Sequence, residues 1–64
     1  MKITLRAARV NANFTQAKVA KILQKNKQTI VNWENGNTKI DAANFSALCD
    51  LYKIDKNYIF LGYK

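Results

Sequence analysis

The chain has 64 residues, of which 48% are apolar, and 11 Lys and Arg against 4 Asp and Glu give a net charge of +7. This length suits one small domain over residues 1–64, and the apolar content predicts a folded chain. With no His and few, scattered acids, the sequence lacks the usual groups for acid–base catalysis or zinc binding. We expect no enzyme activity, no metal site, no cofactor and no small-molecule substrate.

The single cysteine, Cys49, cannot form an internal disulfide, which favours a reducing cytoplasm. The first ten residues carry charges at Lys2, Arg6 and Arg9 and lack the apolar run of a signal peptide. No stretch approaches the roughly 20 apolar residues that span a membrane. We therefore expect a cytoplasmic protein without a membrane partner.

The positive charge is concentrated in the first three-fifths of the chain. Residues 1–39 hold eight basic side chains and one acid, Glu34, whereas residues 40–64 hold three lysines and three aspartates. One basic region on a small folded domain is typical of a protein that binds a polyanion, above all nucleic acid. An acidic protein or a membrane surface is the alternative partner that charge alone leaves open.

The apolar spacing is helical throughout, and no segment keeps a period of two, so we predict an all-α, compact five-helix fold. The first helix covers about Thr4–Asn11, with Thr4 as a plausible N-cap, and the second covers about Gln16–Leu23, capped by Thr15. Asn13 lies in the turn between them, where we expect a left-handed backbone.

The third helix is predicted over about Lys27–Asn35, with Asn26 as N-cap and Gly36 as a stop that supplies positive φ. Ile30 and Trp33 lie on one face of this helix. Their spacing favours core packing for Trp33 over stacking on a nucleobase.

The fourth helix is predicted over about Ala42–Tyr52 after the cap Asp41, with Cys49 on its core stripe as a buried, inert thiol. The fifth is predicted over about Lys56–Leu61 after the cap Asp55, with Phe60 among its inward residues. The tail is aromatic and apolar, and part of it is our candidate dimer surface: Tyr58, Leu61 and Tyr63.

Residues of about 16–35 carry the strongest functional pattern. Two helices of about eight residues flank a turn of about three, and a small residue, Ala20, lies where the helices approach. Ile30 anchors the second helix, which presents polar residues outward. This pattern indicates a helix-turn-helix, whose second helix enters the DNA major groove.

The segment resembles the Cro and phage-repressor type of helix-turn-helix, the xenobiotic-response-element class. The likeness covers about residues 4–61, including a tail similar to the family's fourth and fifth helices. The opening is like that of small regulators of Gram-positive bacteria and their phages. The matching residues are Leu5, Arg6, Arg9, Thr15, Gln16, Ala20, Leu23, Thr29, Ile30, Trp33, Glu34 and Gly36.

Three places depart from the family pattern. Asn13 stands for a glycine, Gln24 and Lys25 stand for Gly-Val in the inter-helix turn, and Ile40 stands for a proline. We expect either a positive φ at Gln24 or a local change in the turn.

The outward face of the third helix supplies the candidate base contacts. Gln28 fits a bidentate bond to adenine, Lys27 either reads guanine or neutralises a phosphate, and Val31 packs on a thymine methyl. The complete set is Lys27, Gln28, Thr29, Val31 and Asn32.

Other residues are expected to hold the DNA backbone or the site itself. The resemblance implies that Gln16 contacts a phosphate and the recognition helix, and that Arg9 and Glu34 form a structural ion pair. The candidate phosphate contacts are Gln16, Lys18, Asn35, Asn37, Thr38 and Lys39.

The sequence thus predicts a DNA-binding transcriptional regulator of phage or prophage type, either a repressor or a Cro-like protein. Helix 27–35 would read a pseudo-palindromic operator of double-stranded DNA, bound by a homodimer. The alternative is a protein-interaction module on the same fold, an antitoxin or an anti-repressor. The chain is either a whole protein or the N-terminal domain of a longer repressor.

Overall fold

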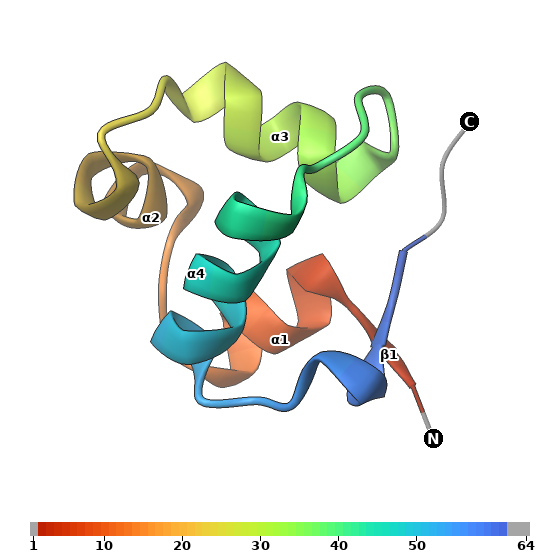
Figure 1. Cartoon of the computed structure of the whole chain (residues 1–64). Helices are drawn as coiled ribbons and strands as arrows, with labels where there is room; N and C mark the ends of the chain where they lie inside the picture. Colours follow the sequence, from red (N-terminus) through yellow and green to blue (C-terminus); the bar gives the residue numbers. More distant parts are fainter. Residues whose placement is uncertain (1, 62–64) are drawn as a thin grey trace.

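The computed structural model describes residues 2–61, and within them four α-helices pack together with a short two-stranded ribbon that joins the two chain ends (Figure 1). In Figure 1, α4 runs through the middle of the molecule, with α3 across one end and η1 at the other. The elements in order are β1 Ile3–Thr4, α1 Leu5–Asn11, α2 Gln16–Leu23, α3 Lys27–Asn35, α4 Ala42–Tyr52, the 3-10 turn η1 Lys56–Tyr58 and β2 Ile59–Phe60.

The last element is where the predicted five-helix, all-α fold is wrong. In place of a helix over Lys56–Leu61, the chain makes one 3-10 turn and then a strand, which pairs in parallel with β1 so that Ile3 lies opposite Ile59. The predicted cap does form, because the Asp55 carboxylate accepts from the Asn57 amide at 2.8 Å. Aromatic and β-branched residues follow that turn, and such residues favour extended backbone where a partner strand is in reach.

This change reverses the place of Phe60. A strand alternates its side chains between two faces, so burial of Ile59 directs its neighbour outward. Ile59 is 5% exposed and Phe60 is 58% exposed, which corrects the prediction that Phe60 points into the core.

The helix starts are only partly made by side-chain caps. Thr4 accepts from the amide of Ala7 at 3.0 Å, and Thr15 accepts from that of Lys18 at 3.1 Å, as their N-cap positions predict. Asn26 and Asp41 take the extended N-cap backbone, but within residues 2–61 neither side chain bonds a backbone N–H of its helix. The predicted N-cap positions of Asn26 and Asp41 are confirmed, but their side chains add no capping hydrogen bond.

Left-handed residues end three of the helices. Gln24 (φ 56°), Gly36 (φ 75°) and Lys53 (φ 56°) follow α2, α3 and α4, and Asn13 (φ 65°) lies in the turn after α1. Each helix end closes by a bond from the next amide to a carbonyl five residues back, as Lys25 N to Ala20 O at 2.8 Å shows. The expected positive φ at Asn13 and Gly36 is confirmed, and at Gln24 the structure has the first of the two alternatives, a positive φ.

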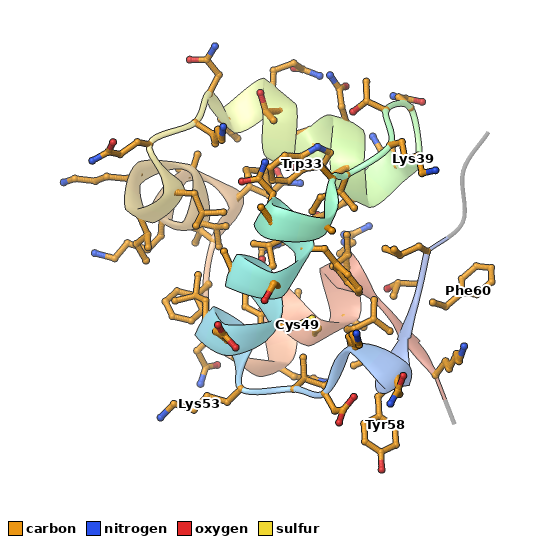
Figure 2. All side chains as sticks on the ribbon, in the orientation of Figure 1. Trp33, Lys39, Cys49, Lys53, Tyr58 and Phe60 are labelled. Carbon is orange, nitrogen blue, oxygen red and sulfur yellow. The ribbon has the colours of Figure 1, made fainter. Side chains whose placement is uncertain are left out.

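The core lies between the four helices and the ribbon. Val19, Ile30 and Leu48 are its fully buried members, from α2, α3 and α4. Trp33 is 8% exposed and points from α3 toward α4 (Figure 2), which confirms its core position. Cys49 is buried as predicted.

Candidate nucleic-acid interface

The helix-turn-helix is built from α2, the turn 24–26 and α3. Ala20 is 4% exposed, and its lack of a bulky side chain lets the two helices approach. The left-handed Gln24 and the Lys25–Ala20 bond turn the chain sharply, so that α3 leaves α2 at a steep angle (Figure 1). The small residue and the turn together set the tilt of α3.

Glu34 ties α3 to the two helices before it. Its Oε2 accepts from Arg9 Nε at 2.7 Å, and its Oε1 accepts from Gln16 Nε2 at 2.9 Å and from Arg9 Nη2 at 3.4 Å. Arg9 Nη1 also donates to the carbonyl of Phe14 at 2.8 Å, in the turn between α1 and α2. The carboxylate therefore has partners on α1 and α2, which fix α3 in rotation as well as position.

The candidate base contacts divide into two groups by exposure. Lys27 and Gln28, in the first turn of α3, are exposed, whereas Thr29, Val31 and Asn32 are half-buried. Gln28 Nε2 donates to Asn32 Oδ1 at 3.0 Å, one helical turn along. The two amide side chains are thus joined on one face of α3.

The candidate phosphate contacts lie on either side of that face. Lys18 is exposed on α2, and the loop after α3 exposes Asn37, Thr38 and Lys39 next to the exposed Asn35. Figure 2 shows Lys39 on this loop. Gln16 is half-buried and already bonds Glu34 through one amide hydrogen. Its amide nitrogen carries a second hydrogen, so a phosphate contact and the bond to α3 are compatible.

The predicted dimer residues lie apart from α3. Tyr58 is 56% exposed on η1, at the end of the molecule opposite α3 in Figure 2, while Leu61 is half-buried. Tyr63 lies outside the described residues. The sequence analysis missed Phe60, whose exposed ring is close to Tyr58 in the chain, because it assigned that residue to a helix.

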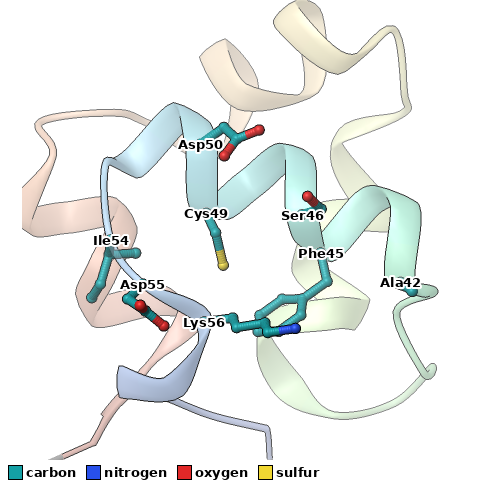
Figure 3. A pocket seen from close by; sticks show the side chains of 8 residues that line it. All are labelled: Ala42, Phe45, Ser46, Cys49, Asp50, Ile54, Asp55 and Lys56. Atoms are coloured by element: carbon teal, nitrogen blue, oxygen red, sulfur yellow. The ribbon is translucent and has the colours of Figure 1, made fainter.

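A second feature that the sequence did not reveal is an open groove of about 550 Å³ between α4 and residues 54–56. Figure 3 shows the Cys49 thiol facing it, with Phe45 from the same helix and Lys56 from η1 also lining it. Burial raises the pKa of Cys49, and the nearby Asp50 and Asp55 raise it further against the opposing effect of Lys56. This environment keeps the thiol protonated and therefore weakly reactive.

Two further findings concern the described residues. None of their helices is both long and apolar enough to cross a bilayer. None of their His, Cys, Asp and Glu side chains gather in groups of three or more that suit a metal ion.

Comparison with known families agrees with this geometry. A family model described as a helix-turn-helix domain matches residues 3–64. The chain belongs to the helix-turn-helix domain family. Searches of curated proteins and of solved structures give no significant match. As a helix-turn-helix domain, the chain has the fold that DNA-binding regulators use to place one helix in the major groove.

Proposed function

We propose that this chain is a sequence-specific transcriptional regulator that binds double-stranded DNA through α3. The observation that carries the proposal is the anchoring of α3 by Glu34 to both α1 and α2, which leaves a polar face with two amide side chains outward. Anchored amides suit base reading, because a side chain must be held in register to distinguish hydrogen-bond patterns in the major groove. No catalytic role is proposed, and the cytoplasm is the proposed location.

The charge distribution also supports DNA binding through α3. The basic excess lies in residues 1–39, which form α1, the helix-turn-helix and the loop after it. Lys18 and Lys39 flank α3, where the sugar–phosphate backbones run when a helix lies in the major groove. The N-terminus of α2 adds free backbone N–H groups, which favour a phosphate beside Gln16.

We propose that two copies bind a pseudo-palindromic operator, as a Cro-like or repressor-type regulator of phage origin would. Half-sites then lie about one helical turn apart. The exposed Tyr58 and Phe60 support a contact surface near the chain end, together with Leu61 and Tyr63. Residues 40–64 have as many lysines as aspartates, so two copies meet there without charge repulsion.

The test is selection of bound duplexes from a random DNA library, followed by titration of the winner at several salt concentrations. We expect an inverted repeat and, for about six phosphates neutralised by the dimer, a slope of log affinity against log salt of roughly −5. Lys39→Ala should weaken all sequences alike and reduce that slope by about 2, because each of the two copies loses one phosphate contact. Lys56→Ala is the matched control for the slope, since it removes the same charge on η1, away from α3, and should leave the slope unchanged.

The rival proposal is an interaction module on the same fold, an antitoxin or an anti-repressor that binds an acidic protein. It predicts no enriched sequence and a salt-sensitive affinity equal for all duplexes. That outcome would move the search to acidic protein partners.

A further inference from the structure

The bond between Gln28 and Asn32 fixes which hydrogen-bonding groups each amide offers to a ligand. Gln28 Nε2 donates to Asn32 Oδ1 at 3.0 Å. A primary amide has two donor hydrogens on nitrogen and one acceptor oxygen. Gln28 is therefore left with one donor and its acceptor oxygen. Asn32 is left with both donors, while Gln28 occupies one of the two lone pairs on its oxygen.

The hydrogen-bonding groups that Gln28 and Asn32 still offer match different bases. In the major groove, adenine presents an acceptor at N7 beside a donor at N6, and guanine presents two acceptors, N7 and O6. One donor with one acceptor, as on Gln28, complements adenine. Two donors, as on Asn32, complement guanine.

Resting on the proposed function, we propose that Gln28 and Asn32 act as one reading unit that selects adenine through Gln28 and guanine through Asn32 at neighbouring base pairs. Asn32 is then a positioning residue for Gln28 as well as a base contact of its own. The bond is exposed in the free protein, where water competes with it. Burial in the major groove removes that water and strengthens the bond. The coupling between Gln28 and Asn32 is therefore strongest in the DNA complex.

A one-turn spacing on α3 fits this division. Residues four apart lie on the same face of a helix, about 6 Å apart. Successive base pairs are about 3.4 Å apart along the duplex, so two side chains on such a face reach different base pairs. Glu34 holds α3 in place through Arg9 and Gln16. Neither of these residues takes part in the bond between Gln28 and Asn32.

The experiment measures binding of the full chain to its selected duplex and to the same duplex with each base of the half-site replaced. The wild type should prefer adenine and guanine at two neighbouring positions. Asn32→Ala should reduce the preference at both positions, because Gln28 then loses its anchor. The combined loss of affinity in Gln28→Ala/Asn32→Ala should be at least about threefold smaller than the product of the two single losses.

Asn32→Asp separates the two roles of Asn32. Aspartate keeps an oxygen for Gln28 but offers the base an acceptor in place of two donors. We expect the adenine preference to remain and the guanine preference to change to cytosine, whose N4 group is a donor. Asn57→Ala, an exposed amide on η1, is the matched control and should leave both preferences unchanged. A thermal unfolding curve for each variant checks that it is folded.

The outcomes distinguish the pair from the proposed function. Enrichment of a specific site with independent, multiplicative losses at Gln28 and Asn32 would overturn the reading unit and leave the regulator intact. Retention of the guanine preference in Asn32→Asp would overturn the base assignment. A wild type that enriches no site would overturn the proposed function, and the reading unit with it.

Discussion

Arg9 and Glu34 form an ion pair of 2.7 Å between Nε and Oε2, with side chains only 11% and 4% exposed. The contact joins the first helix to the recognition helix, and Gln16 completes it from the helix between them. Because both charges are buried, each one neutralises the other. Either charge without its partner would be costly to keep out of water.

Removal of one member should therefore be severe. We expect Arg9→Ala to lower the free energy of unfolding by about 3–5 kcal/mol, since it strands the Glu34 carboxylate. A domain of this size has little stability to spare, so urea unfolding should show a largely unfolded variant. Arg9→Met combined with Glu34→Leu should recover much of the loss. If the double variant is as unstable as Arg9→Ala, the ion pair itself stabilises the fold, beyond the neutralisation of two buried charges.

The left-handed Gln24 predicts a stabilising substitution. A non-glycine residue in this region costs roughly 1–2 kcal/mol, part of which glycine regains despite its greater freedom when unfolded. We expect Gln24→Gly, at φ 56°, to raise the free energy of unfolding by about 0.5–1 kcal/mol in urea titrations. Lys21→Gly, inside α2, should instead lower it by about 1 kcal/mol. Equal losses in both variants would contradict a left-handed helix end.

The strand that replaces the expected fifth helix predicts opposite effects at adjacent residues. Ile59→Ala should cost about 2–4 kcal/mol because the side chain is 5% exposed. Phe60→Ser should stay within about 0.5 kcal/mol in the monomer, since its ring is 58% exposed. A large loss for Phe60→Ser in dilute protein would restore the helical prediction. Weaker self-association of the same variant in sedimentation would support its place in the dimer surface.

The buried hydroxyl of Tyr52 predicts how the free energy of unfolding changes at alkaline pH. The pKa of Tyr52 is raised to about 12, chiefly by burial and to a smaller extent by Glu34, against the opposing effect of Arg9. The unfolded chain releases this proton near pH 10 whereas the folded one keeps it, so stability from this group is complete below pH 10 and is lost as pH rises toward 12. The loss is at most about 3 kcal/mol.

The measurement is urea unfolding from pH 8 to 12 in the wild type and in Tyr52→Phe. All other titratable groups are common to both proteins, so their contributions cancel in the difference. The wild type should lose more stability than Tyr52→Phe above pH 10. Parallel pH curves would mean that the hydroxyl is as well solvated in the folded chain as in the unfolded one.

The first four helices could be read from the sequence because local signals agree there. Thr15, the apolar stripe through Val19 and a residue able to end the helix lie in one short segment. The sequence did not decide the backbone conformation at Gln24, since glutamine has no particular preference for the left-handed region. It forms because the packing of α2 on α3 requires a tight turn at that point.

The chain end could not be read in the same way. A short apolar run such as Tyr58–Leu61 suits a helix or a strand equally. The choice is made by Ile3, which lies at the other end of the sequence and offers a strand to pair with. The same limit applies to the candidate site: spacing placed Gln28 and Asn32 on one face, but the direction of the bond between them needed the side-chain positions.

The ribbon also bears on how the molecule folds. Pairing Ile3 with Ile59 encloses nearly the whole chain, and closing so large a loop costs entropy that only the assembled helices can offset. We expect the ribbon to form after the rate-limiting step. Ile59→Ala should then speed unfolding and hardly slow folding, and amide exchange in the ribbon should occur by opening that leaves the helix-turn-helix intact.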